Sequence, residues 1–343
     1  MSSPVTAFPV WDLPIRQAAE FNISSQRPQS LYWFVAGLVE KLFNLAEYFG
    51  IKGSGYALAR ATLNYDPDDL AAYYLDFASR ADYPGPFDAK GLALTRIGQR
   101  SVYMPINVVL YGLGQLELCR KSGSDLHRER FKAMLEWLCE NQAASGIWLT
   151  SVPKPEFGLH RPYQSAMLQG LGISCLVRGS FLFSEYRYMK SAYRALKPFR
   201  TRVEQGGVTA ILPEGPFYEE YICRPPCHVL NGFFFAIWGL YDLVRLEDHA
   251  EARQLWQDGV ATIVKLLSHY DIGYWSLYHI PGEPNPATPK YHDLHIEQLR
   301  VMYRLTGEDT FSEYARRWQE YTDEFSNALK TLPAKLRWIA SRK

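Results

Sequence analysis

Residues 229–246 read VLNGFFFAIWGLYDLVRL and predict a long apolar helix. A polar turn at Glu247-Asp248 follows, and residues 252–267 continue as a second helical segment. Acidic side chains favour the start of a new helix, because they accept hydrogen bonds from its free backbone N–H groups. The segment therefore predicts a hairpin of two helices, with the apolar helix on the inside.

The same arrangement recurs three more times along the chain. In each unit an apolar helix ends in a polar turn, and a second helix begins at an acidic or hydroxyl residue. The units cover residues 103–137, 163–196 and 295–321. About four hairpins in series predict a mainly α fold, an (α/α) barrel or toroid that is complete or incomplete.

Long loops rich in Gly, Pro and aromatic residues connect the hairpins, at residues 146–162, 206–226 and 274–292. In a toroid these loops gather at one end of the helices, and there they would build the cleft. We expect short β-hairpins within them, one of them just after Gly206-Gly207.

The chain divides into an N-terminal arm, residues 1–30, and a single α/α-barrel catalytic domain, residues 31–343. The arm has scattered Pro and Ser without a clear period. The domain is expected to open with a helix at residues 31–49, and a loop-rich stretch at residues 64–99 follows it.

The amino-acid composition limits the classes of molecule that the protein is expected to bind. The 343 residues are 47% hydrophobic and 21% charged, as in soluble globular proteins. A net charge of +1 indicates no nucleic-acid partner. The aromatic share of 15% favours an aromatic cleft, because sugar rings stack on aromatic faces.

The cysteines form no CxxC motif, and we expect free thiols in a reducing compartment. The spacing of the last two leaves room for a disulfide or a metal pair, but neither has a partner motif. The cysteines are Cys119, Cys139, Cys175, Cys223 and Cys227.

The first residues lack the basic and apolar regions of a signal peptide. The most apolar run, residues 232–244, is too short to span a membrane. We therefore expect a cytoplasmic protein without a membrane span.

The run Phe217-Tyr-Glu-Glu-Tyr221 places two carboxylates between two phenols, just before the hairpin that begins at residue 229. Carboxylates and phenols serve as acids and bases, so the run predicts proton transfer at a carbon or at a sugar ring. Side chains alternate along a regular strand. Glu220 and Tyr221 therefore share a site only if the chain bends there.

Several blocks occur in an order that resembles one enzyme family. They are Tyr163-Gln-Ser-Ala-Met-Leu-Gln-Gly170, Tyr218-Glu-Glu-Tyr221, Val229-Leu-Asn-Gly-Phe233, Gly239-Leu-Tyr-Asp-Leu243 and His295-Ile-Glu-Gln-Leu299. Together they resemble the D-glucuronyl C5-epimerases of heparan and heparosan metabolism. The resemblance is close over residues 160–322 and weaker over residues 80–160.

The resemblance implies a helical (α/α) barrel catalytic domain, in agreement with the hairpins. It implies inversion of C5 in glucuronate residues of a heparosan-like polysaccharide, which gives iduronate, without an organic cofactor. The implied partner is a glucuronate-containing polysaccharide, and a homodimer is left open.

The resemblance also implies catalytic residues. Glu220 and Tyr221 match the family's catalytic pair, and Tyr278 and Tyr291 match two further functional tyrosines. Epimerisation needs a base on one face of the ring, an acid on the other, and a group that neutralises the substrate carboxylate. We expect the first pair to act on one face and the second on the other, with base and acid left open.

Further residues are candidates for substrate binding: Tyr103, Asn107, Tyr163, Gln169, Tyr218, Glu219, Arg224, Asn231, His279, His292 and His295. Tyr163 and Gln169 fit a cleft wall, and Asn231 fits a helix N-cap equally well. The spacing of His292 and His295 places both on one helix face and also suits a metal pair. No third ligand pattern follows, so we expect no metal.

One departure from the family pattern concerns charge. The family carries an Arg shortly after the equivalent of Tyr278, whereas this chain reads His279-Ile-Pro-Gly-Glu283. His279, His292, His295 or Arg224 would have to neutralise the substrate carboxylate instead.

Other functions are compatible with the same residues. A polysaccharide lyase shares the abstraction at C5 and differs in expelling the C4 oxygen. A non-catalytic glycan-binding homologue would account for the missing Arg. A glycoside hydrolase is disfavoured, because it needs opposed carboxylates about 5–9.5 Å apart and Glu219 and Glu220 are adjacent.

Overall fold

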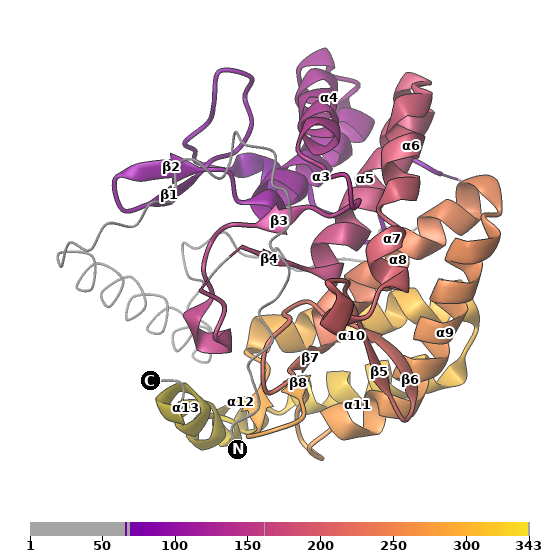
Figure 1. The fold of residues 1–343 in the computed structure, drawn as a ribbon. Coiled ribbons are helices and arrows are strands. Elements are labelled where there is room, and N and C mark those ends of the chain that lie inside the picture. The colour runs from indigo at the N-terminus through magenta and orange to yellow at the C-terminus, as the bar shows by residue number, and fades with distance from the viewer. Residues whose placement is uncertain (1–65, 67–68, 161, 342–343) are drawn as a thin grey trace, which may run out of the picture.

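The computed structural model describes residues 66, 69–160 and 162–341. The predicted arm at residues 1–30 and the predicted helix at residues 31–49 lie outside the described residues. The described part is mainly helical, with a few short strands, as predicted (Figure 1).

All four predicted hairpins form, and the two helices of each pair pack against each other (Figure 1). The pairs are α3 (Pro105–Ser122) with α4 (Asp125–Glu140), α5 (Ala166–Phe183) with α6 (Tyr186–Arg194), α8 (Leu230–Glu247) with α9 (Ala250–Leu266), and α10 (Pro289–Thr306) with α11 (Asp309–Asp323). The first helices also pack in sequence order, α3 on α5, α5 on α8 and α8 on α10. They form the inner row that the apolar pattern predicted.

Helix ends follow the local sequence closely. Gly123 and Gly307 end α3 and α10 with φ of 67° and 68°, a left-handed conformation that glycine adopts without steric cost. Two differences from the prediction arise. The second helix of the third hairpin is capped by His249, whose side chain accepts from the Ala252 N–H, rather than by an acidic residue. The helix α10 begins at Pro289 and not at His295, because proline fits a first helical turn.

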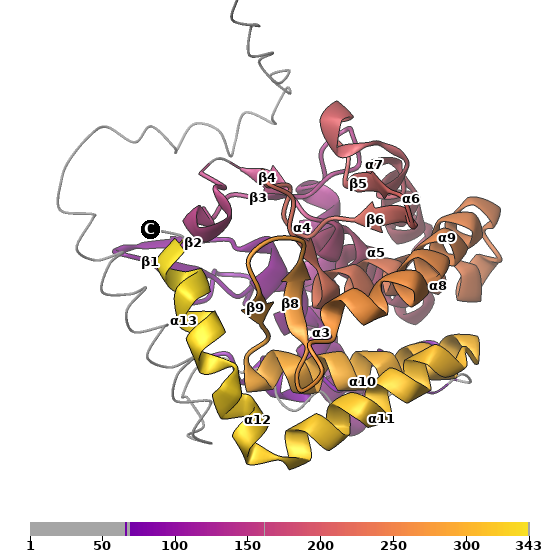
Figure 2. The ribbon, with the colours of Figure 1, turned by 90° about the horizontal axis from the view of Figure 1, so that it is seen from below.

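The remaining described helical segments are short. They are η1 (Ala78–Asp82), η2 (Pro155–Phe157), α7 (Lys197–Arg200), η3 (Val203–Gln205), η4 (Leu267–Tyr270), α12 (Phe325–Lys330) and α13 (Leu332–Ser341). Figure 2 shows α12 and α13 leading away from α11 and passing β9 (Asn285–Pro286). The Lys335 ammonium holds α13 there, since it donates to Asn285 Oδ1 at 2.7 Å and to the Pro286 carbonyl at 3.1 Å.

The loops carry the predicted short β-hairpins. The strands are β1 (Thr95–Ile97), β2 (Arg100–Val102), β3 (Leu149–Thr150), β4 (Tyr163–Gln164), β5 (Thr209–Leu212), β6 (Gly215–Tyr218), β7 (His228–Val229), β8 (Leu277–Ile280) and β9. The strand β1 pairs with β2, β3 with β4, β5 with β6, and β8 with both β7 and β9, all antiparallel. The pair β5–β6 is the hairpin expected after Gly206-Gly207.

Two glycines allow α5 and α8 to touch through their backbones. A Cβ atom on Gly239 would lie 2.2 Å from the Gly170 carbonyl oxygen, and a Cβ on Gly170 would lie 2.3 Å from the Phe235 carbonyl oxygen. No side chain fits between the helices at this point. The inner row is therefore tightest where its two most apolar helices cross.

A buried ion pair joins the same two helices. The Arg178 guanidinium on α5 donates to Asp242 Oδ2 on α8 at 2.6 Å and to the Ala72 carbonyl at 2.9 Å. The Tyr74 hydroxyl donates to the other Asp242 oxygen at 2.7 Å. Both charged side chains are almost fully buried, so pairing and hydrogen bonding are what make their burial tolerable.

The helix α5 is, within the described residues, long and apolar enough to span a membrane by length and composition. Of that 18-residue window, 78% is buried inside the protein, as in a core helix. The run identified from the sequence as the most apolar, residues 232–244, lies in α8 rather than in α5. All five cysteines are free thiols.

The close contact of α5 and α8 leads to a first prediction. Gly239→Ala should lower the free energy of unfolding by about 1–3 kcal/mol, because the new methyl group meets backbone that cannot rotate away. Urea unfolding followed by circular dichroism measures the change. The control Gln257→Ala on the exposed face of α9 should stay within about 0.5 kcal/mol of wild type. Equal stability of wild type and Gly239→Ala would contradict the backbone contact.

Candidate active site

Three connecting loops bring four tyrosines together. Tyr163 precedes α5, Tyr221 follows β6, Tyr278 lies on β8, and Tyr291 lies in the first turn of α10. All four pack in one apolar cluster, which is separate from the main helical core. Tyr291 also packs against the main core. The Tyr278 and Tyr291 ring centroids are 5.0 Å apart, and those of Tyr163 and Tyr221 are 6.1 Å apart. We call these residues the tyrosine cluster.

The chain bends after β6, and the bend decides which side chains enter the cluster. The strand ends at Tyr218, and residues 219–227 are irregular. Antiparallel strand pairs hold both ends of this irregular stretch: β6 pairs with β5 before it, and β7 pairs with β8 after it. Glu220 and Tyr221 can therefore share one site, which strict alternation along a strand would have prevented.

A register shift places Tyr278 in the same way. The pairing of β8 with β9 slips between Leu277 and His279, and Tyr278 is the residue at the slip. Such a bulge redirects one side chain relative to its strand. Tyr278 is buried and lies beside Tyr291 in the tyrosine cluster.

Glu220 is a buried carboxyl group at the start of α8. Its side chain lies on Gly232, where an added Cβ would be 2.3 Å from Oε2. Burial raises its pKa to about 7, while a hydrogen bond with Tyr221 and the charge of Lys154 act in the opposite direction. Oε2 has no hydrogen-bond partner among the described residues. A carboxyl group with this pKa takes up and releases a proton near neutral pH.

Three of the four tyrosines have a raised pKa. Burial raises the pKa of Tyr221 and of Tyr278 well above the usual value, and the Glu220 charge raises both further. Burial and Glu220 also raise the pKa of Tyr163. These phenols hold their protons at neutral pH, so they are suited to donate a proton rather than to accept one.

Aromatic residues that the sequence did not single out form the walls of the cluster. Phe157 stacks on Tyr221 with ring centroids 4.4 Å apart and planes at 20°. Trp338 on α13 lies 6.1 Å from Phe157 and 5.8 Å from His279. Phe157 lies in the predicted aromatic-rich loop at residues 146–162, whereas Trp338 lies beyond residue 322, where the family resemblance ends. His279, a predicted substrate-binding residue, thus lies beside the cluster.

Three predicted substrate-binding residues have structural partners instead. Glu219 Oε1 is 2.6 Å from His228 Nδ1, and its carbonyl accepts from the Ala166 N–H at 2.8 Å. The Tyr218 hydroxyl donates to the Leu255 carbonyl on α9 at 2.6 Å. Gln169 is fully buried, and its amide bonds to the backbone of Gly146 and Trp148. These contacts argue for supporting roles and against contact with substrate.

His292 and His295 share one face of α10, as their spacing predicted, but they face another part of the interior. Ser276 Oγ lies 2.7 Å from His292 Nδ1 and 3.0 Å from His295 Nδ1. His292 stacks on Trp275 with centroids 3.8 Å apart. Burial lowers the pKa of His292 to about 4 and that of His295 well below its usual value. Both are neutral at neutral pH and cannot neutralise a substrate carboxylate.

Four predicted residues remain, and they lie in three different parts of the chain. The Tyr103 hydroxyl donates to Asp88 Oδ2 at 2.7 Å and Asn107 Nδ2 donates to Thr95 Oγ1 at 2.9 Å, so both serve the region around β1 and β2. Arg224 is exposed on the loop after Tyr221. Asn231 is the second residue of α8 rather than its N-cap, and its buried Oδ1 has no hydrogen-bond partner among the described residues.

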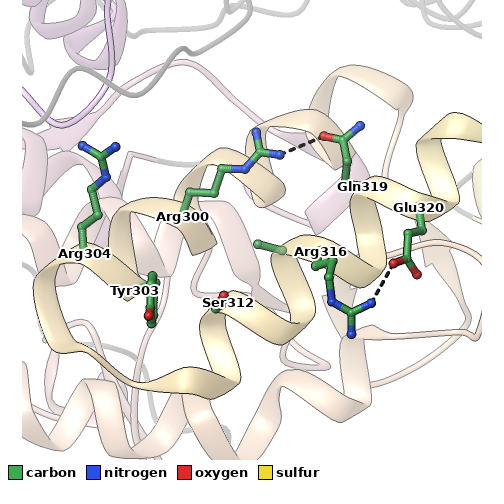
Figure 3. A pocket seen from close by; sticks show the side chains of 8 residues that line it. Arg300, Tyr303, Arg304, Ser312, Arg316, Gln319 and Glu320 are labelled. Atoms are coloured by element: carbon green, nitrogen blue, oxygen red, sulfur yellow. Dashed lines mark hydrogen bonds and ion pairs between the residues drawn. The ribbon is translucent and has the colours of Figure 1, made fainter.

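A hollow lies on the fourth hairpin, between α10 and α11 (Figure 3). It has a volume of about 450 Å³ and is lined by Arg300, Tyr303, Arg304, Ser312, Ala315, Arg316, Gln319 and Glu320. Two of its arginines are already paired, Arg300 with Glu297 and Arg316 with Glu320. None of the acid–base residues of the tyrosine cluster lines it. The described residues contain no cluster of His, Cys, Asp and Glu that could hold a metal ion.

The buried carboxyl group leads to a prediction for stability. The pKa of Glu220 is about 4.5 in the unfolded chain and about 7 in the folded protein. Between these two pH values the unfolded chain has released the proton and the folded protein still holds it, so the free energy of unfolding falls as pH rises. Glu220→Gln removes this loss. The stability of the variant relative to wild type should therefore improve by about 3 kcal/mol between pH 4 and pH 8. Urea titrations at both pH values measure it, and a pH-independent difference would contradict the buried carboxyl group.

Comparison with known proteins gives the family. Residues 145–320 match the model of the D-glucuronyl C5-epimerase C-terminus. A D-glucuronyl C5-epimerase of Caenorhabditis elegans is 34% identical over 216 residues, which are 57% of this chain and 35% of that protein. An uncharacterized protein of Methanocaldococcus jannaschii is 28% identical over 178 residues, 51% of this chain and 57% of that protein.

The chain thus spans about a third of the nematode enzyme and rather more than half of the archaeal protein. The matched segment begins before Trp148 and ends within α11, so it contains α5, α8, α10 and the whole tyrosine cluster. Together with the geometry, this match shows that the chain belongs to the D-glucuronyl C5-epimerase family.

Proposed function

We propose that this protein is a polysaccharide uronate C5-epimerase that converts D-glucuronate into L-iduronate residues in a heparosan-like polymer. The observation that carries the proposal is a buried carboxyl group, Glu220, with a pKa of about 7 beside tyrosines that hold their protons. Family membership supports epimerase chemistry. We further propose that the four hairpins belong to an (α/α) toroid.

Glu220 is the base in this proposal. The hydrogen on C5 is a very weak acid, since its removal places a second negative charge next to a carboxylate. A carboxylate base with a pKa near the working pH is well matched to accept it. The C5–H bond breaks, the proton moves to Glu220, and the electron pair spreads onto the substrate carboxyl group.

A tyrosine completes the inversion from the other face. The electron pair returns to C5 and forms a new C–H bond with a proton from Tyr278 or Tyr291. The phenol then needs its proton back, and Glu220 carries one in excess. Tyr221 follows Glu220 directly in the chain and influences the pKa of both Glu220 and Tyr278, so we propose its hydroxyl group as the path for that return.

The two alternative functions fit the site less well. A lyase would use the same base but would also need a proton donor at the C4 oxygen, and family membership favours epimerisation. A non-catalytic binding protein would have no use for a buried carboxyl group that weakens the fold at neutral pH. Hydrolysis is disfavoured further, because Glu219 is engaged by His228.

Hydrogen exchange tests the proposal. Incubation with a glucuronate polymer in D2O should place deuterium at C5 and produce iduronate signals in NMR spectra, with chain length unchanged. Glu220→Gln and Tyr221→Phe should each slow this exchange by at least about 100-fold, because each removes a proton-transfer group. The exposed Tyr303→Phe, on α10, is the matched control and should exchange at the wild-type rate.

The other outcomes are distinct. Shortened chains with unsaturated ends would identify a lyase. Binding of the polymer without exchange would favour the glycan-binding protein. Wild-type exchange rates in both site variants, with circular dichroism spectra unchanged, would contradict the assigned residues.

A further inference from the structure

We infer that Lys154 binds the carboxylate of the uronate substrate and supplies the positive charge that the segment after Tyr278 lacks. This inference rests on the proposed function, because it names how that site recognises its substrate. The segment after Tyr278 reads His279-Ile-Pro-Gly-Glu283 and contains no Lys or Arg. Lys154 comes from a different loop, the one between β3 and β4.

The backbone holds Lys154 at the edge of the tyrosine cluster. Its N–H donates to the Leu159 carbonyl at 2.7 Å, and its carbonyl accepts from the Leu159 N–H at 3.0 Å. The two bonds close a tight loop around η2. Phe157 projects from this loop onto Tyr221 at 4.4 Å, and Leu159 packs in the same cluster. Lys154 is therefore fixed a few residues from a ring that touches the catalytic pair.

The charge of Lys154 reaches the reacting group, since it lowers the pKa of Glu220. Its neighbour Glu156 acts on Tyr163, which places both members of this ion pair beside the cluster. A cation in that position also stabilises the negative charge that moves onto the substrate carboxyl group as the C5 proton leaves.

The ammonium group of Lys154 is available for a new partner. Its nearest carboxylate oxygen, Glu156 Oε1, is 3.6 Å away, and the two side chains are 27% and 38% exposed. Such a long, partly solvated pair is weak. Lys335 also lies near the cluster, over Trp338, but its ammonium donates to Asn285 and to the Pro286 carbonyl and anchors α13. A substrate carboxylate can displace Glu156 far more easily than it can free Lys335.

The test compares two ligands that differ in one group. Calorimetry measures the binding of a heparosan oligosaccharide and of its carboxyl-reduced counterpart to the full chain. Lys154→Gln should weaken binding of the carboxylate form about tenfold to a hundredfold and leave binding of the reduced form unchanged. Lys154→Arg should retain the preference for the carboxylate. Lys190→Gln, an exposed lysine on α6, is the control.

The C5 exchange rate of the same variants separates this inference from the proposed function. If the wild-type protein exchanges C5 hydrogen and Lys154→Gln loses the carboxylate preference, with kcat reduced more than KM is raised, both stand. If exchange occurs but Lys154→Gln binds and reacts like wild type, the role of Lys154 is wrong and the epimerase proposal survives. If exchange never occurs yet the preference depends on Lys154, the carboxylate site stands without the epimerase.

Two further results would overturn the role of Lys154. One is a wild-type protein that does not distinguish the carboxylate ligand from the reduced ligand. The other is an equal loss of affinity for both ligands in Lys154→Gln, which would mean that the substitution disturbs the loop rather than a charge contact.

Discussion

The structure depends on the direct backbone contact between α5 and α8. Gly170 and Gly239 remove the side chains that would otherwise hold the two helices apart. The distance between the helices sets the distance between their first turns, where the site is built. Tyr163 enters just before α5, Gly232 supports Glu220 in the first turn of α8, and the Ala166 N–H binds the carbonyl of Glu219. The proposed catalytic pair, Glu220 and Tyr221, thus lies next to the helix crossing where the backbones approach most closely.

The site also contains a buried carboxyl group that lowers the free energy of unfolding at neutral pH. Glu220 is buried against Gly232, and its Oε2 lacks a hydrogen-bond partner among the described residues. Burial disfavours the charged form, which brings the pKa near neutrality and also weakens the fold there. Glu219, one residue earlier, is buried to a similar extent but bonds to His228. Burial raises the pKa of Glu219 as well, but the contact with His228 acts in the opposite direction, and this partner is the reason why we propose a supporting role for Glu219.

Sequence patterns predicted the helices well and the partners of polar residues poorly. Apolar periodicity and polar turns identified all four hairpins, because both signals are local. The tyrosines were identified through family resemblance, and the structure brings Tyr163, Tyr221, Tyr278 and Tyr291 together. His292 and His295 illustrate the limit. Their three-residue spacing correctly placed them on one helix face, but spacing does not say that the face meets Ser276.

The sequence by itself determined the helical hairpins, the order of the loops and the acid–base residue types, because these follow from local periodicity, turn chemistry and motif order. Only the tertiary structure decided that the chain bends after Tyr218, that both Glu219 and Glu220 are buried and Glu219 meets His228, and that Phe157, Lys154 and Trp338 border the site. A pKa depends on burial and on neighbouring charges. Those neighbours come from loops more than fifty residues apart, and packing alone brings them together.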